Sequence, residues 1–237
     1  MSYTYEYERG ALTVDCVVFG VSLEEKSTLD VLMIRRAQDP YKNYLALPGG
    51  FVNMNETVSD AASRELEEET GAKISYMEQL FTFSDPKRDP RERVVSVAHF
   101  ALVRSNEHNV IGGDDASEAM WIPIQNLLGV SKTEPLAFDH TDIIELALKR
   151  LQAKIRYSPI GFNLLPDIFT IPQIQKLYET ILIRKIEKRN FHKKILKMGI
   201  LKEIGKEGKV RNRPAKLYSF DEDAYNNAVN NGFNFEI

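Results

Sequence analysis

Residues 50–72 have the sequence GFVNMNETVSDAASRELEEETGA. Residues 58–70 are mostly good helix formers and stop at Gly71, so they predict a helix with a glycine at its C-terminal end. Four glutamates lie close together behind Arg64: Glu65, Glu67, Glu68 and Glu69. At about 100° per residue, all of them except Glu67 share one face of this helix.

Like charges on one helix face repel each other, so a compensating partner is expected. Arg64 can pair with Glu68 at the i+4 position. A hard divalent cation would compensate more fully, because carboxylate oxygens suit Mg²⁺ or Mn²⁺. Acidic helices are also common on protein surfaces, where water solvates their charges. The helix alone therefore leaves both interpretations open.

The residues around the helix favour the metal interpretation. Pro48-Gly49-Gly50 allows a tight turn before it, and Glu56 lies near its start. The fixed positions follow the pattern G-x5-E-x7-R-E-U-x-E-E-x-G-U, with Ala72 in the last aliphatic position. This stretch resembles the Nudix box. The resemblance implies an α/β Nudix fold, an α/β/α sandwich around a mixed sheet. It also implies hydrolysis of a nucleoside diphosphate linked to another group.

The same resemblance implies the roles of individual residues. Mg²⁺ or Mn²⁺ would be bound by the Gly50 carbonyl and three box glutamates: Glu65, Glu68 and Glu69. The expected catalytic residues are Arg64 and the same three glutamates. The metal would neutralise developing charge and activate a water for attack on phosphorus. Glu118 is a candidate general base, with a plain surface acid as the alternative.

The composition is that of an ordinary soluble protein, with 237 residues, 43% of them hydrophobic, and a net charge of −3. No run is long and apolar enough for a membrane span, and no secretory signal is expected at the start. Cys16, the only cysteine, lies in an apolar run and is expected to be a buried thiol. These features predict a cytoplasmic protein.

Two domains are predicted, a Nudix domain over residues 1–156 and a winged helix-turn-helix domain over residues 157–237. The first has apolar, β-rich runs at residues 11–21, 28–35, 78–83, 94–103 and 120–124, and helical patterns at residues 58–70 and 141–155. The second has a Pro/Gly-rich connector, two helical stretches and two short strands, which is the layout of a small winged helix-turn-helix. The final residues, from 224 on, are expected to be terminal packing or disorder.

Residues 181–217 are strongly basic. They contain 13 Lys or Arg and three acidic residues, while the chain as a whole is acidic. A basic module on an acidic protein is typical of polyanion binding, although basic helix faces are also often merely solvated. The predicted DNA contacts lie in the second helix and the hairpin turn: Arg189, Asn190, His192, Lys193, Lys194, Lys197, Arg211 and Arg213.

The combination of ALPGGFV, the box, DPKRDPRERVVSVAHFAL, RNFHKKIL and RPAKLYSF resembles the NrtR family of Nudix-related transcriptional regulators. His192 and Lys193 stand where members often have two arginines. The resemblance implies a homodimeric repressor of NAD-metabolism genes that binds a palindromic operator and senses ADP-ribose or a related nucleotide. The expected ligand contacts are Arg88, Arg91 and Arg93.

Two functions remain open from the sequence. One is a DNA-binding repressor that uses its Nudix domain as a sensor. The other is a metal-dependent ADP-ribose pyrophosphatase with a C-terminal accessory domain. The basic segment favours the repressor, and the complete set of box glutamates favours the hydrolase.

Overall fold

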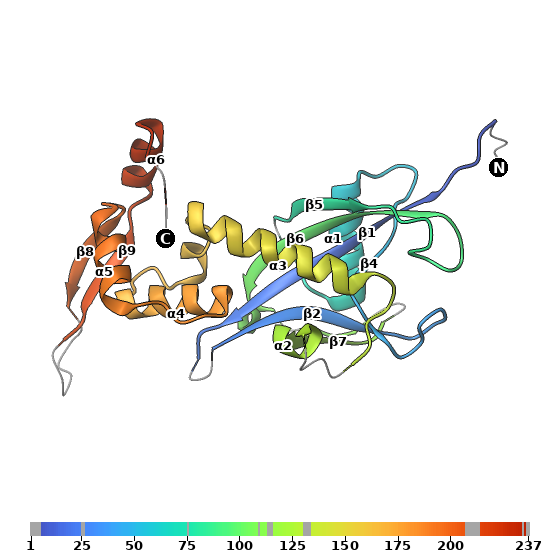
Figure 1. Ribbon diagram of the computed structural model, residues 1–237, viewed down its shortest axis with the longest axis horizontal. Coiled ribbons are helices and arrows are strands. Elements are labelled where there is room, and N and C mark those ends of the chain that lie inside the picture. The colour runs from blue at the N-terminus through green and yellow to red at the C-terminus, as the bar shows by residue number, and fades with distance from the viewer. Residues whose placement is uncertain are drawn as a thin grey trace. The chain divides into compact units, whose positions relative to one another are not determined.

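The computed structural model describes residues 6–24, 27–74, 76–108, 110–112, 116–129, 134–206, 214–233 and 235. The chain divides into two compact units. Unit 1 is Met1–Ser22 with Leu29–Leu148, and unit 2 is Leu23–Thr28 with Lys149–Ile237. Figure 1 labels the helices and strands of both. The predicted domain boundary between residues 156 and 157 stays a prediction.

Unit 1 contains a seven-stranded mixed sheet. Its strands are β1 (Ala11–Ser22), β2 (Thr28–Arg36), β3 (Leu45–Ala46), β4 (Gly49–Phe51), β5 (Glu78–Phe83), β6 (Val94–Arg104) and β7 (Ala116–Pro123). The main order is β3-β2-β1-β6-β5, with β4 paired to β1 and β7 paired to β2. β1 and β6 run parallel along their whole length, whereas β5 is antiparallel to β6. The β-rich runs of the sequence predict the five long strands to within a few residues.

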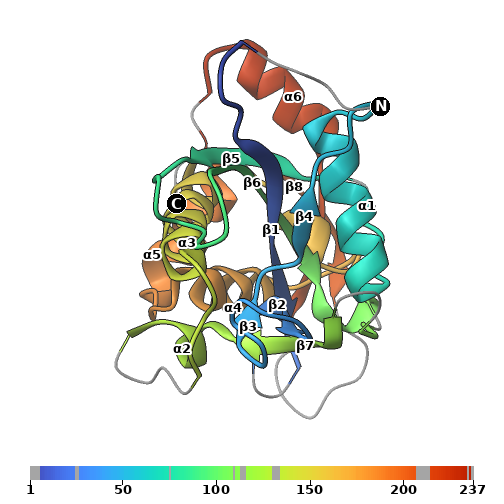
Figure 2. The ribbon, with the colours of Figure 1, turned by 90° about the vertical axis from the view of Figure 1, so that its right-hand side faces the viewer.

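Helices cover both faces of this sheet. Strand residues alternate between the faces, and the even-numbered positions of β1 pack against helix α1 (Val58–Thr70) in an apolar cluster. Asp15, on the opposite face, contacts His140 at the start of helix α3 (His140–Tyr157). Figure 2 shows α1 and α3 on opposite sides of the strands. The short elements are η1 (Ser105–Glu107) and α2 (Ile124–Leu127). The predicted α/β/α sandwich is confirmed.

The first two residues of β4 are glycines that lie close to neighbouring groups. A Cβ on Gly49 would lie 2.1 Å from the Val14 carbonyl oxygen, and one on Gly50 would lie 2.5 Å from the carboxylate of Glu65. The backbone of β1 excludes any side chain at Gly49, whereas a side chain at Gly50 would require the end of the Glu65 side chain to move. The glycines therefore let the backbone pass directly between strand β1 and helix α1.

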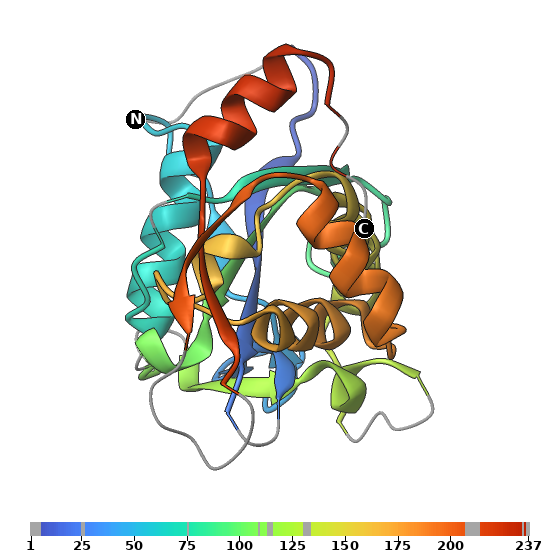
Figure 3. The same ribbon diagram turned by 90° about the vertical axis from the view of Figure 1, so that its left-hand side faces the viewer.

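Unit 2 contains the predicted winged helix. Its elements are η3 (Phe162–Leu164), α4 (Ile171–Leu182), α5 (Lys188–Lys197), β8 (Leu201–Lys206), β9 (Lys216–Phe220) and α6 (Glu222–Asn230). Phe169 and Tyr218 exchange two backbone hydrogen bonds of 2.8 and 2.9 Å beside the β8–β9 hairpin. Helix α4 contacts both α5 and strand β9, and Figure 3 shows this unit facing the viewer. The winged-helix prediction is confirmed, and its layout places α5 as the helix that precedes the wing.

Helix α6 occupies part of the tail that the sequence assigns to terminal packing or disorder. The Asp221 carboxylate accepts a hydrogen bond from the Ala224 N–H and caps the helix. Tyr225 packs against Phe220 with ring centroids 5.8 Å apart. In the part of the chain described above, no helix is long and apolar enough to cross a bilayer.

Candidate functional site

Local sequence fixes both ends of helix α1. The Thr57 hydroxyl accepts from the Asp60 N–H, and the Asp60 carboxylate accepts from the Thr57 N–H. This reciprocal pair is a capping box. At the other end Gly71 adopts a left-handed conformation with φ 70°, which costs glycine little. The helix that presents the box glutamates is therefore defined by its own residues.

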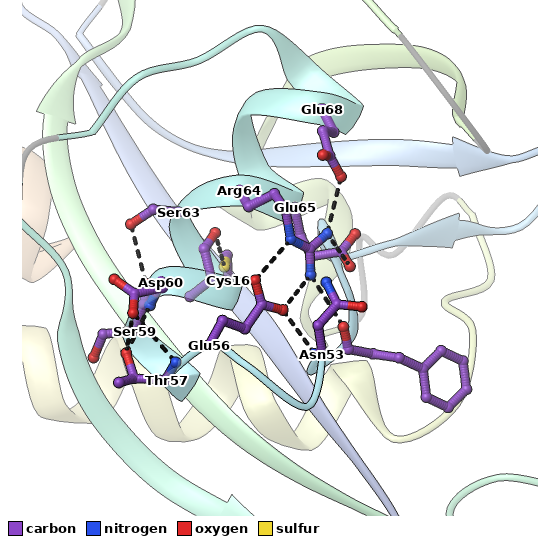
Figure 4. A network of polar contacts seen from close by, with 12 residues as sticks. Cys16, Asn53, Glu56, Thr57, Ser59, Asp60, Ser63, Arg64, Glu65 and Glu68 are labelled. Atoms are coloured by element: carbon purple, nitrogen blue, oxygen red, sulfur yellow. Dashed lines mark hydrogen bonds and ion pairs between the residues drawn. The ribbon is translucent and has the colours of Figure 1, made fainter. Parts of the chain in front are cut away.

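Arg64 is the hub of the box. Its guanidinium donates to Glu56 at 2.7 Å, to Glu65 at 2.8 Å and to Glu68 at 2.9 Å. It also donates to the Phe51 carbonyl. Figure 4 shows the three glutamates converging on this one side chain. The hydrogen bonds from Arg64 and from the Asn53 N–H hold the pKa of Glu56 at about 2. Arg64 thus orients two of the expected metal ligands and ties the preceding loop to the helix.

The other box glutamates have distinct environments. Glu69 is buried and accepts a 2.9 Å hydrogen bond from the Gly49 N–H. Burial raises the pKa of Glu65 above its ordinary value, with the neighbouring Glu68 acting in the same direction, and Arg64 opposes both. Glu67 pairs with Lys73 at the surface, as its predicted outward direction requires.

The predicted metal ligands have oxygen donors of the kind that a divalent cation prefers. Their side chains are not arranged around one point as metal ligands would be. All four line one cavity and offer only oxygen donors: Gly50, Glu65, Glu68 and Glu69. Within the described residue ranges, no group of three or more His, Cys, Asp or Glu side chains has a metal-holding geometry. Arg64 holds two of the carboxylates instead. The ligand set stays a prediction.

The cavity has a volume of about 320 Å³ and lies wholly within unit 1. This is at the lower end of the range for small-molecule sites, roughly 300–1,000 Å³. The lining contains the box glutamates. It also contains arginines and aromatic rings: Arg36, Arg91, Phe51 and Phe138. A ligand that fills the cavity therefore meets two different chemical surfaces.

A buried polar cluster forms part of the cavity wall. The Asp15 carboxylate accepts from Arg88 at 3.0 Å and from the Ser96 hydroxyl, and it contacts His140 at 3.3 Å. Arg88, whose side chain is only 5% exposed, also donates twice to Asp139, at 2.8 and 2.9 Å. Arg88 lines the cavity, and its side chain donates to these two carboxylates; its contact with a ligand stays a prediction.

The hydrogen bonds of His140 define its tautomer. Its Nδ1 accepts from the buried Leu47 N–H at 2.9 Å, so the proton is on Nε2, which faces Asp15. Burial raises the pKa of Asp15. His140, Arg88 and Ser96 outweigh that effect and bring this pKa down to about 2. The carboxylate is therefore ionised at every physiological pH.

The other two predicted ligand arginines differ in position. Arg91 lines the cavity, and Asp89 holds its Nε and Nη2 at 3.0 and 2.8 Å. Arg93 donates to the Ser84 carbonyl and is not among the residues that line the cavity. The structure brings Arg88 and Arg91 together at the site and leaves Arg93 outside it.

Helix α5 presents a basic surface in unit 2. Phe191 and Ile195 are buried, and Phe191 packs against Tyr178 of α4 at 5.7 Å. All six predicted DNA contacts on this helix are exposed: Arg189, Asn190, His192, Lys193, Lys194 and Lys197. The predicted contacts Arg211 and Arg213 lie outside the described residues.

The turn between α4 and α5 is held by one carboxylate. Glu179 accepts from the Ile186 N–H at 3.0 Å, from Lys185 at 2.9 Å and from Gln175 at 2.9 Å. The Glu187 carboxylate then caps α5 by accepting from the N–H groups of its first turn. These contacts fix the direction in which α5 leaves α4.

Comparisons with known proteins agree with both units. Residues 11–147 match the NUDIX domain family, and residues 161–220 match the NrtR DNA-binding winged helix domain. The chain is 35% identical to the "ADPR responsive transcriptional repressor NtrR" of Acinetobacter baylyi, over 91% of this chain and 84% of that protein. The chain belongs to the NrtR family of Nudix proteins.

A solved structure and a second relative extend the comparison. Shewanella oneidensis NrtR in complex with a 27mer DNA is 31% identical, covers 94% of this chain and 97% of that chain, and has a TM-score of 0.72. The "ADP-ribose pyrophosphatase" of Methanocaldococcus jannaschii is 42% identical over 48% of this chain and 63% of that protein. The family resemblance seen in the sequence is confirmed.

Sequence reasoning misses several residues of this NrtR-family site. Asp15 and His140 lie 125 positions apart in the chain, so no local pattern joins them. An acidic residue inside the apolar run TVDCVVFG is the signal that could have identified Asp15, because an unpaired buried charge is costly. Glu118, the candidate general base, lies on strand β7 and forms an ion pair with Arg35 at 3.4 Å. It does not line the cavity.

Replacing Asp15 by Asn tests the buried cluster. Asp15→Asn leaves Arg88 buried beside Asp139 alone, so we expect the free energy of unfolding to fall by about 3–5 kcal/mol. The wild-type carboxylate stabilises the fold above its unfolded pKa near 3.8, and this contribution is lost as the pH falls towards about 2. Urea titrations followed by Trp121 fluorescence measure unit 1.

Glu67→Gln is the matched control. It removes a surface pair with Lys73 and should cost less than about 1 kcal/mol. The Asp15 variant should also lose the extra acid sensitivity of the wild type between pH 4 and 2. Equal stability of the two variants would contradict the role given to the cluster.

Proposed function

We propose that this protein is a DNA-binding repressor whose Nudix unit senses ADP-ribose or a related nucleotide. The observation that supports it best is the pairing, in one NrtR-family chain, of a ligand-sized cavity with an exposed basic helix in a winged helix. A relative that aligns over most of the chain is an ADPR-responsive repressor. We infer that its targets are NAD-metabolism genes, that its operator is palindromic and that it acts as a homodimer in the cytoplasm.

The proposed DNA surface is the exposed side of α5. In a winged helix the helix before the wing enters the major groove, and cations at its edge contact phosphates. Arg189 and Lys193 are four residues apart and therefore lie on one side of α5. Two winged helices in a twofold dimer would contact half-sites separated by one or two helical turns.

Neutralising this surface should weaken operator binding. A plot of log affinity against log salt concentration has a negative slope for a protein that binds phosphates. We expect the double variant Arg189→Ala/Lys193→Ala to make this slope shallower by about 0.9 for each phosphate contact removed. The measurement is a salt series of gel shifts with DNA upstream of the protein's own gene. Lys42→Ala/Lys73→Ala removes two exposed charges of unit 1 and should leave the slope unchanged. An unchanged slope in the α5 variant would exclude α5 as the DNA surface.

The effector role is tested by titrating operator binding with ADP-ribose. A ligand regulates only if its affinity differs between the DNA-competent and DNA-incompetent states. We expect ADP-ribose to weaken operator binding by roughly 5- to 150-fold, and operator DNA to weaken ADP-ribose binding by the same factor. The titration is run in EDTA, so that hydrolysis cannot intervene, and again with Mg²⁺. If saturating ADP-ribose changes operator affinity in neither condition, it is not the effector.

The intact box supports a second function, the hydrolysis of ADP-ribose. The ADP-ribose pyrophosphatase named above aligns with the Nudix unit at 42% identity. Nudix hydrolases use divalent metal ions. We infer that Gly50, Glu65, Glu68 and Glu69 would hold Mg²⁺ or Mn²⁺, which would supply charge neutralisation at the diphosphate. Arg64 orients the carboxylates, and buried Glu69 holds the Gly49 turn in place.

Glu68→Gln separates hydrolysis from sensing. Glu68 is partly exposed, so the change should cost about 1 kcal/mol or less in stability. We expect it to abolish any Mg²⁺-dependent release of AMP from ADP-ribose, because an amide is a poor ligand for a hard cation. Glu67→Gln, one position away and outside the cavity, should retain the wild-type rate. Equal rates in both variants would remove Glu68 from the hydrolytic mechanism.

A further inference from the structure

The turn between α4 and α5 contains a backbone strain that glycine would avoid. Ile183 follows the last residue of α4 and has φ 53° and ψ 36°, the left-handed conformation. This conformation is unfavourable for a side chain that branches at Cβ. Proteins usually have glycine at such a position. A glycine at residue 183 would make the same turn without strain, so the turn itself does not explain the isoleucine.

Hydrogen bonds on both sides of Ile183 hold the turn. The Arg184 N–H donates to the Glu179 carbonyl at 3.2 Å, and the Ile183 N–H donates to the Thr180 carbonyl at 3.4 Å. This pair of bonds is a Schellman motif. The Glu179 carboxylate also accepts from the Ile186 N–H at 3.0 Å. The surrounding contacts therefore fix the strained backbone and the place where the side chain of Ile183 leaves the turn.

The fold leaves much of this apolar side chain in contact with solvent. Ile183 is 43% exposed, whereas Ile181 and Leu182 just before it are 0% and 6% exposed. Four exposed cations lie close to it in the chain: Arg184, Lys185, Lys188 and Arg189. Glu187, the one acid among residues 183–190, uses its carboxylate to cap α5. An apolar side chain among cations matches a polyanion that also has apolar groups. Duplex DNA is such a partner, because thymine has a methyl group in the major groove.

We propose that Ile183 contacts DNA and that its side chain packs against a thymine methyl group of the operator. In a helix-turn-helix the N-terminal residues of the second helix approach the base edges, and the turn directly precedes them. Phosphate contacts carry no sequence information, whereas among the four bases only thymine has this methyl group. The isoleucine thus adds sequence recognition that glycine could not provide. This inference rests on the proposed function, because it requires that the winged helix binds DNA.

The test uses the full-length protein and DNA upstream of its own gene. The DNA is prepared with thymine or with uracil in place of every thymine, which removes only the methyl groups. Wild type should bind the thymine DNA more tightly. In Ile183→Gly this preference should fall by about fourfold for each methyl contact that is lost. Ile183→Val keeps a branched apolar side chain and should keep most of the preference.

The matched control is Ile168→Gly. Ile168 also belongs to unit 2, is 49% exposed and has no left-handed backbone. This variant should keep the wild-type preference for thymine and should unfold at a lower temperature than wild type, because glycine gives the unfolded chain more freedom. Ile183→Gly should unfold at or above the wild-type temperature, since relief of the strain offsets the loss of partial packing. Thermal unfolding thus shows that a loss of recognition in Ile183→Gly is not a loss of folding.

Two kinds of failure give different results. If wild type binds both DNAs and Ile183→Gly shows the same preference for thymine, the role of Ile183 is contradicted and the repressor function stands. If wild type binds neither DNA, the proposed repressor function is contradicted, and this inference with it.

Discussion

The buried carboxylate of Asp15 is the interaction on which the rest of the site depends. It joins strand β1, strand β6 through Ser96, the loop of Arg88 and the start of α3 through His140. His140 in turn accepts a hydrogen bond from the Leu47 N–H. Two residues later, the Gly49 N–H donates to Glu69 of helix α1. Each partner satisfies a charge or polar group that would otherwise be costly to bury. Removing the carboxylate would therefore disturb several walls of the cavity at once.

Two elements that meet at this carboxylate lead along the chain into unit 2. Strand β1 continues into Leu23–Thr28, which belongs to unit 2, and Lys176 of α4 donates to the Leu23 carbonyl at 3.0 Å. Helix α3 begins at the cavity with His140, and its residues from Lys149 onward belong to unit 2, where Gln152 donates to the Ile181 carbonyl of α4. Helix α3 is therefore one element whose first residues belong to unit 1 and whose last residues belong to unit 2.

The sequence predicts those features that depend on interactions between residues close together in the chain. The ends of α1 are correct because Thr57, Asp60 and Gly71 act within one helical turn of the residues they cap. The long strands are correct because their alternation and β-branched content are local. Strands β3 and β4 are too short to produce a pattern, and α6 depends on packing of Tyr225 against Phe220. The site was predicted where the box defines it and missed where Asp15, Phe138 and His140 arrive from distant segments.

The charges of the cavity decide how sensing and hydrolysis relate to each other. A diphosphate beside Glu65 and Glu68 would face two carboxylates that Arg64 alone offsets in the described geometry. Without a metal ion, other cations of the lining, Arg36 and Arg91 among them, would have to supply the attraction for the diphosphate. A bound cation would add attraction at the glutamates and would have to compete with Arg64 for the same two carboxylates. In the proposed function, losing a cation at the box would remove one source of ligand affinity and leave the arginines and rings of the remaining lining in place.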